Sequence, residues 1–111
     1  MGKKEPKVET KIKPVCVISD ETKHKNVCNE IHQLYVDKNH DYGDSAAKMY
    51  KEFGLMSIVY RLQDKVNRLK VLANEDARVK NESIRDTLMD ISNYSAIGIV
   101  EHDKLVEKLN K

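Results

Sequence analysis

Apolar side chains that return every three or four positions set the strongest limit on how this chain can fold. Such a period places the side chains in a stripe along one side of an α-helix, and the stripe is stable when another element buries it. The period occurs at Val27, Cys28, Ile31, Leu34 and Tyr35, again at Ile58, Leu62, Val66 and Leu69, and again at Ile84, Leu88, Ile91, Ser95 and Gly98. We therefore expect an all-α protein.

Capping and turn residues divide this pattern into separate helices. Ser19 and Asp20 are preferred at a helix start, and Gly54 is a natural stop. Residues 38–44 are dense in turn formers, and Asn81 is the expected cap of the last long helix. The expected helices span about 20–38, 45–53, 57–72 and 82–102, and residues 103–111 either extend the last helix or form a fifth. Four or five helices with short links predict a helical bundle.

Length and charge narrow the class of protein. The 111 residues suffice for one domain, which we place at residues 15–111, behind a Lys-rich tail over residues 1–14 that we expect to be disordered. The 20 basic and 18 acidic residues leave a formal charge of +2, too small an excess to predict direct binding of nucleic acid. No apolar run approaches the ~20 residues that span a bilayer, and no signal peptide is recognisable. We expect a cytoplasmic protein without membrane contact.

The two cysteines fit neither a disulfide scaffold nor a metal cluster. Cys28 belongs to the apolar stripe of its helix, so we expect a buried free thiol. A bridge between Cys16 and Cys28 is the less favoured alternative in a reducing compartment.

Two expected helices carry rows of charge. The third helix presents four charged residues on one face, and the fourth presents three carboxylates at one-turn spacing. These residues are Arg61, Asp64, Lys65 and Arg68, and then Glu82, Asp86 and Asp90. A solvated face with local salt bridges is the simplest interpretation. The carboxylates repel one another, however, and call for positive charge from the facing helix or from a divalent cation.

The second interpretation is a site for metal and phosphate. Carboxylate oxygens suit Mg²⁺ or Mn²⁺, and the expected ligands are Asp64, Glu82, Asp86 and Asp90. Asp64, Asp86 and Asp90 are also the candidate catalytic residues, acting through a metal-bound water. Nearby cations would hold phosphate oxygens, and the candidates are Arg61, Lys65 and Arg68.

Residues 38–44 form a second candidate site. Lys38, Asn39, Asp41 and Tyr42 gather a cation, an amide, a carboxylate and a phenol beside Gly43. A helix end followed by a tight turn is the common outcome for such a string. The functional alternative is a nucleotide-binding corner, in which Lys38 or His40 reaches phosphate and Tyr42 stacks on a base.

Four sequence blocks in this order resemble the nucleotide modification associated domain family, first type, whose members are small proteins common in bacteriophages. The resemblance covers roughly residues 24–100. The blocks are Lys38-Asn39-x-Asp41-Tyr42-Gly43-x-Ser45, then Phe53-Gly54, then Arg61-Leu62-x-Asp64-Lys65-x-x-Arg68-Leu69, and then Glu82-Ser83-x-x-Asp86-Thr87-Leu88-x-Asp90-x-x-Asn93-Tyr94.

This resemblance implies a relation to all-α nucleoside triphosphate pyrophosphohydrolases of the MazG and dimeric dUTPase kind. Those enzymes use Mg²⁺, work as dimers or tetramers, and carry a Glu-x-x-Glu pair on one helix and a Glu-x-x-Asp pair on the next. Here Asp64 has no second acid three residues away, and Thr87 stands where the glutamate before Asp90 would be. The sequence therefore departs from the hydrolase pattern at the metal ligands.

Three functions fit these observations. The first is an Mg²⁺-dependent nucleoside triphosphate pyrophosphohydrolase that releases pyrophosphate. The second is a protein that binds or sequesters a nucleotide without chemistry, including a signalling nucleotide of host immunity if a phage encodes the chain. The third is a structural or regulatory subunit whose charged rows form salt bridges. Apolar residues beyond a single stripe, Ile97, Ile99 and Val100, predict a homodimer or higher oligomer.

Overall fold

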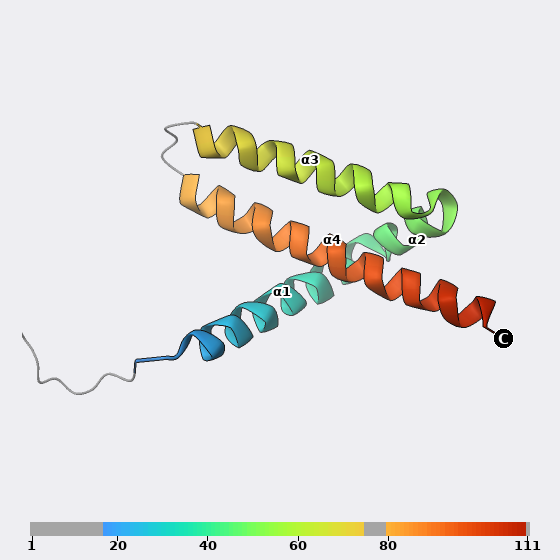
Figure 1. The fold of residues 1–111 in the computed structure, drawn as a ribbon, viewed down its shortest axis with the longest axis horizontal. Helices are drawn as coiled ribbons and strands as arrows, with labels where there is room; N and C mark the ends of the chain where they lie inside the picture. The colour runs from blue at the N-terminus through green and yellow to red at the C-terminus, as the bar shows by residue number, and fades with distance from the viewer. Residues whose placement is uncertain (1–16, 75–79, 111) are drawn as a thin grey trace, which may run out of the picture.

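A computed structural model describes residues 17–74 and 80–110, and within them it contains four helices and no strand. The all-α prediction is confirmed. The expected tail over residues 1–14 lies outside the described residues. The helices are α1 (Asp20–Tyr42), α2 (Ser45–Phe53), α3 (Leu55–Asn74) and α4 (Lys80–Leu109). α3 and α4 run antiparallel, and α1 lies across the other side of α4 (Figure 1).

α1 begins where the sequence predicts and ends later. The side chain of Ser19 accepts a hydrogen bond from the backbone N–H of Thr22, as an N-cap should. The predicted turn over residues 38–44 is wrong for most of its length, because the helix continues to Tyr42. Gly43 ends it in a left-handed conformation with φ of 61°. Polar residues in an exposed last turn weaken a helix only slightly, so they do not stop it.

The last long helix also starts earlier than predicted. α4 begins at Lys80, so Asn81 lies inside the helix and is not its cap. The helix then continues without a break to Leu109, which removes the alternative of a separate fifth helix. Gly54 separates α2 from α3 as expected, with φ of 71° and ψ of −159°, a backbone conformation that suits only glycine.

The core is small and lies between α2, α3 and α4. Its buried apolar residues in the described part of the chain are Tyr50, Ile58, Leu72 and Met89. Gly98 of α4 is also buried and faces Ile58 of α3. The absence of a side chain at this position lets the two long helices approach each other.

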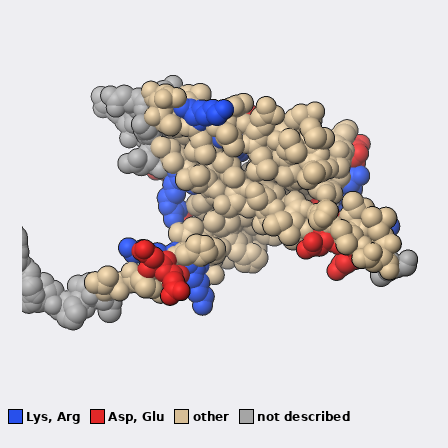
Figure 2. All heavy atoms as spheres, in the orientation of Figure 1, with Lys and Arg blue, Asp and Glu red and all other residues tan. Residues whose placement is uncertain are grey.

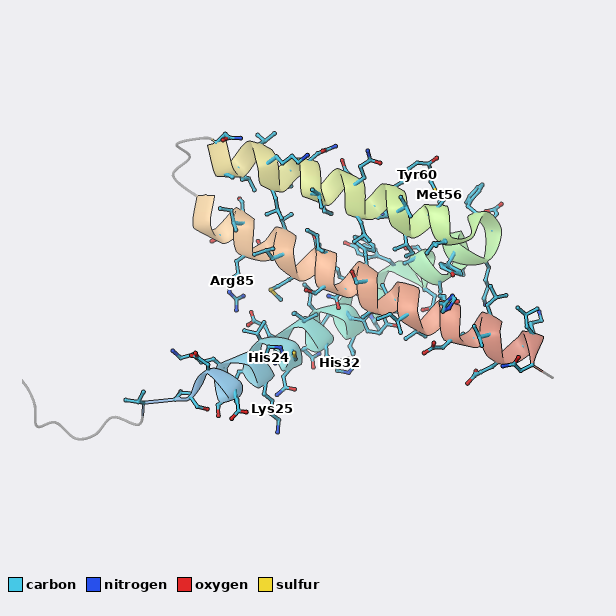
Figure 3. All side chains as sticks on the ribbon, in the orientation of Figure 1. His24, Lys25, His32, Met56, Tyr60 and Arg85 are labelled. Carbon is cyan, nitrogen blue, oxygen red and sulfur yellow. The ribbon has the colours of Figure 1, made fainter. Side chains whose placement is uncertain are left out.

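Polar contacts hold α1 against α4. The guanidinium of Arg85 donates to both carboxylate oxygens of Glu30, at 2.7 and 2.6 Å, and Figure 3 shows Arg85 extending from α4 toward α1. The Asn93 amide donates to the carbonyl oxygen of Ile31 at 3.1 Å. α1 itself has no buried residue. These polar pairs therefore help to fix the position of a helix whose apolar residues are at most half-buried.

The apolar stripe of α1 is only partly covered within one chain, since Ile31, Leu34 and Tyr35 are half-buried and Val27 is exposed. Cys28 is an exposed free thiol, so the prediction of a buried thiol is wrong. Val17, just before the helix, is 92% exposed. The radius of gyration is 19.8 Å, against about 13 Å for a compact domain of about 100 residues. The arrangement is open because α1 projects from the other helices (Figure 1).

Substitutions at Gly98 test the contact between α3 and α4. A Cβ atom there would lie 3.5 Å from Ile58 Cγ2, which is ordinary contact, and alanine favours helix by up to about 1 kcal/mol. Gly98→Ala should therefore keep or raise the free energy of unfolding. Gly98→Leu should lower it by about 1–3 kcal/mol through overpacking. Urea unfolding followed by circular dichroism measures both, and a leucine variant as stable as the native chain would contradict the close approach.

The pair between Arg85 and Glu30 predicts a pH dependence. The Arg85 hydrogen bonds hold the pKa of Glu30 below its ordinary value, and the same pair raises the pKa of Arg85. Because the folded-state pKa of Glu30 is depressed, the pair stabilises the fold above the unfolded pKa of about 4.3. That contribution is lost as the pH falls through the lower folded-state pKa.

Arg85→Gln should raise the pKa of Glu30 toward its ordinary value and remove this part of the pH dependence. Carboxyl NMR titration measures the pKa directly. Lys70→Gln removes a positive charge from α3 instead and serves as the matched control. A Glu30 titration that is the same in the native chain and in Arg85→Gln would show that the pair does not form in solution.

Candidate functional site

Asp90 of α4 is the centre of the candidate site. Its Oδ1 lies 3.1 Å from the Lys38 ammonium of α1, and its Oδ2 lies 3.2 Å from the Lys65 ammonium of α3. The Asp90 side chain is only 19% exposed, whereas that of Lys38 is 48% exposed. One half-buried carboxylate thus holds two cations from two other helices, and a side of Lys38 still faces solvent.

Arg61 adds a third cation next to this group. Its Nη1 donates to the hydroxyl of Tyr94 at 3.1 Å, and its guanidinium carbon lies 5.5 Å from the centroid of the Tyr94 ring. The second distance is that of a cation–π contact. Tyr94 follows Asp90 by one turn of α4, so α4 orients both Arg61 and the two lysines.

These side chains surround a small depression, which we call the cationic hollow. Its volume is about 170 Å³. The polar residues that line it are Tyr35, Lys38, Asn39, Tyr42, Ser45, Arg61, Asp90, Asn93 and Tyr94. Its walls come from α1, the start of α2, α3 and α4. Two cations, two amides and three phenols at one opening provide donors for an anion of several oxygens.

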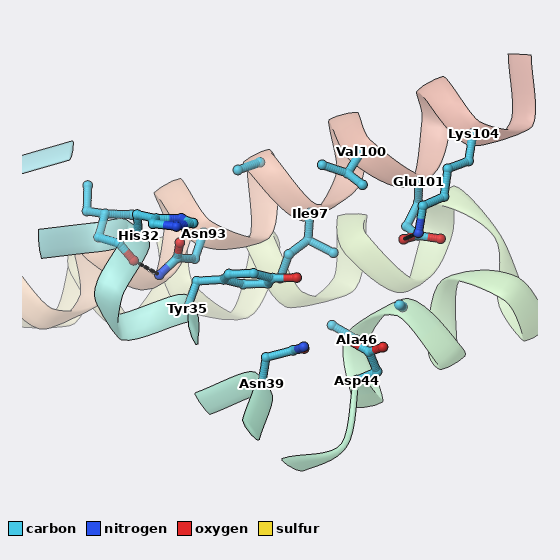
Figure 4. Close-up of a pocket in the computed structure, with 13 residues that line it drawn as sticks. His32, Tyr35, Asn39, Asp44, Ala46, Asn93, Ile97, Val100, Glu101 and Lys104 are labelled. Carbon is cyan, nitrogen blue, oxygen red and sulfur yellow. Dashed lines mark hydrogen bonds and ion pairs between the residues drawn. The ribbon is translucent and has the colours of Figure 1, made fainter. Parts of the chain in front are cut away.

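A larger depression adjoins the cationic hollow, and we call it the apolar groove. Its volume is about 470 Å³, and it runs between α1, the start of α2 and the second half of α4 (Figure 4). The two depressions share the residues Tyr35, Asn39, Ala46, Asn93 and Ile97 as walls. They are therefore continuous, with Lys38 and Arg61 at one end and, at the other, apolar side chains together with Asp44, Glu101 and Lys104.

The far end of the apolar groove contains an ion pair between a buried carboxylate and an exposed lysine. Glu101 is 6% exposed, and its Oε2 lies 3.0 Å from the Lys104 ammonium one turn further along α4. This hydrogen bond, together with the charge of Glu101, raises the pKa of Lys104. Lys104 is thus held in its charged form next to the carboxylate.

The structure gathers about half of the predicted site residues. Those that meet at the cationic hollow are Lys38, Asn39, Tyr42, Arg61 and Asp90, and Lys65 joins them through Asp90. The others lie outside it and are exposed, and they are Asp41, Asp64, Arg68, Glu82 and Asp86. Asp41 instead lies 3.2 Å from the imidazole of its neighbour His40. The two blocks predicted as separate sites, residues 38–44 and the charged rows, thus meet at one place.

The predicted metal ligands fit a cation poorly within one chain. Across residues 17–74 and 80–110, the structure holds no group of three or more His, Cys, Asp or Glu side chains that could bind a metal ion. Asp64, Glu82, Asp86 and Asp90 are therefore not gathered. Both oxygens of Asp90 face ammonium groups, whose positive charge opposes that of a metal ion.

The residues of the apolar groove do not stand out in the sequence. The helical period places Tyr35 in the apolar stripe of its helix, and Glu101 belongs to no motif. One signal was available, because the acidic row on α4 continues at helical spacing through Tyr94 and Ile97 to Glu101 and Lys104. Following that face along the whole helix would have joined the cationic hollow to the apolar groove.

Comparison with known proteins identifies the family of the chain. A sequence model of the family described as "Nucleotide modification associated domain 1" matches residues 38–101, more than half of the chain and a range that begins at Lys38 and ends at Glu101. The chain therefore belongs to this family. No curated protein and no solved structure has significant similarity to it. None of the helices in the described residues is long and apolar enough to cross a bilayer.

Proposed function

Since the chain belongs to the nucleotide modification associated domain 1 family, we propose that it binds a nucleotide through its phosphate groups at the cationic hollow. The observation that supports this most directly is the convergence of Lys38, Arg61 and Lys65 from two helices around Asp90 and Tyr94 of a third. Phosphate oxygens accept strong hydrogen bonds from ammonium and guanidinium groups.

The arrangement around Asp90 suits reversible binding. Without ligand, the Asp90 carboxylate compensates the charges of Lys38 and Lys65. An incoming phosphate competes for the same ammonium protons, and Lys38 can turn to it because it is half exposed. Asn39 and Asn93 supply amide donors at the opening. Tyr42, which is 65% exposed, offers an aromatic face at the rim.

We favour binding without chemistry over hydrolysis. Pyrophosphohydrolase activity with Mg²⁺ or Mn²⁺ would need the predicted ligands to share a cation, and one described chain does not gather them. Sequestration of a nucleotide, including a signalling nucleotide, needs only the cations of the hollow. A cytoplasmic site of action, in the host cell if a phage encodes the protein, belongs to the same proposal.

Substitution of Lys38 tests the phosphate contact. Lys38→Gln should weaken binding of nucleoside triphosphates by about tenfold, the effect of about 1.4 kcal/mol, because one charge-assisted hydrogen bond is lost. Lys51→Gln removes a charge from the exposed side of α2, away from the hollow, and should leave affinity unchanged. Isothermal titration calorimetry at low salt, with chelator present, measures both. Equal affinity in Lys38→Gln and the native chain would reject the proposal.

Substitution of Asp90 separates phosphate competition from metal binding. Asp90→Asn frees Lys38 and Lys65 from their carboxylate, so nucleotide affinity in chelator should rise several-fold, by less than 1.4 kcal/mol. A hydrolase that uses Asp90 as a metal ligand would instead lose pyrophosphate release. Chromatography of the nucleotide after incubation with Mg²⁺ shows which applies. Pyrophosphate release by the native chain that Asp90→Asn abolishes would establish hydrolysis in place of simple binding.

We further propose a homodimer or higher oligomer. Exposed apolar side chains on α1 and α4 support it, among them Val27, Val36, Leu88 and Ile99. Figure 2 shows a broad face with few charged side chains, which gather at its margins. Surfaces of this kind commonly mark contacts between proteins.

Light scattering at micromolar concentration should give at least twice the chain mass of 12.8 kDa. Val27→Ser should weaken the association, since it removes an exposed methyl pair from the α1 stripe. Lys25→Ser, two residues away on the same helix, is the matched control and should not. A monomer in the native sample would defeat the proposal.

A further inference from the structure

We propose that the apolar groove receives the base of the bound nucleotide and that Glu101 selects guanine. The inference rests on the proposed function, since it assumes that the phosphates lie in the cationic hollow. It adds the identity of the base and a binding residue for it.

The two depressions form one site with chemically different ends. They share five wall residues, so a ligand can extend from one into the other. Lys38 and Arg61 stand at one end. The apolar groove lies at the other, and its volume of about 470 Å³ is within the range of pockets that hold small ligands. A nucleotide has the matching order, with phosphates at one end and a flat base at the other.

The walls of the apolar groove suit a flat ring. Tyr35, Ile97 and Val100 present aromatic and aliphatic surface, and Figure 4 shows these side chains around the same opening as Glu101. Tyr35 also lies next to His32, with ring centroids 6.3 Å apart and an interplanar angle of 25°. The contact steadies the Tyr35 ring, against which a base can pack.

Glu101 is the buried polar group among those that line the groove, and it gives the groove its specificity. It is 6% exposed, and within the described chain Lys104 is its hydrogen-bond partner, at Oε2 alone. Oε1 has no protein donor there. A buried carboxylate with an unfilled oxygen is unfavourable, because desolvation is not offset. A hydrogen-bond donor on a ligand in the groove would give Oε1 of Glu101 a partner.

Guanine is the common base whose edge matches a carboxylate. Its N1–H and exocyclic N2–H₂ are adjacent donors, so each oxygen of Glu101 can accept one. The next atom on that edge, O6, is an acceptor, and the Lys104 ammonium beside Glu101 has protons left to donate. Adenine and cytosine place a ring-nitrogen acceptor next to their amino group, and uracil flanks its single N–H with two carbonyls. Each of these would set a lone pair against the carboxylate.

The first experiment compares nucleotides on the native chain. Isothermal titration calorimetry in chelator gives affinities for GTP, ATP, CTP, UTP and ITP, the last being GTP without its N2 amino group. GTP should bind about tenfold or more tightly than ITP and than the other three, because a bidentate contact contributes about this much discrimination. Equal affinities for GTP and ITP overturn the guanine assignment while leaving phosphate binding in place. No binding of any triphosphate overturns the proposed function and this inference together.

The second experiment changes the carboxylate. Glu101→Gln preserves shape but replaces one acceptor by an N–H₂ donor, so the preference of GTP over ITP should fall to about twofold or less. Lys38→Gln should weaken GTP and ITP equally and keep their ratio. Glu107→Gln, an exposed neighbour on α4, is the matched control. The role of Glu101 is overturned if the ratio of GTP affinity to ITP affinity is the same in a folded Glu101→Gln sample as in the native chain. If that variant does not fold, the ratio of the two affinities on the native chain decides.

Discussion

The contact of Asp90 with two lysines is the interaction on which the site depends. It joins α1 and α3 to α4 through a carboxylate that is only 19% exposed, at distances of 3.1 and 3.2 Å. Partial burial strengthens such a contact relative to one in open solvent. It also holds Lys38 and Lys65 together, although like charges repel. The cations are thereby kept in place for an anionic ligand that can replace Asp90 as their partner.

The open shape of the molecule follows from how α1 is attached. α1 has no buried residue, and it is fixed to α4 by Arg85 with Glu30, by Asn93 with a backbone carbonyl, and by Lys38 with Asp90. The space between α1 and the other helices contains both the cationic hollow and the apolar groove. The site thus lies at the junction of α1 with the other helices, while the small core under α2, α3 and α4 supports it.

Local signals in the sequence predicted the helices well and their ends less well. Ser19 caps α1, and Gly54 separates α2 from α3, because these residues act through their own backbone and nearest neighbours. The turn expected over residues 38–44 was wrong, since polar residues alone do not end a helix. Cys28 was expected to be buried, because periodicity shows which residues share a face but not whether another element covers it.

The sequence by itself determined the all-α class and the family, and it identified the cationic residues Lys38, Arg61 and Lys65 as candidates. Helical period and motif order are properties of the chain. Only the tertiary structure decided which charges meet. Carboxylates at one-turn spacing predicted a metal site, yet Asp90 turns to Lys38 and Lys65 while Glu82 and Asp86 remain exposed. The physical reason is that spacing fixes neighbours along one helix, whereas partners 52 residues apart, such as Lys38 and Asp90, depend on how helices cross. The spacing along α4 shows that Glu101 shares a face with Asp90, but only the same crossing placed Glu101 in one groove with Tyr35 of α1.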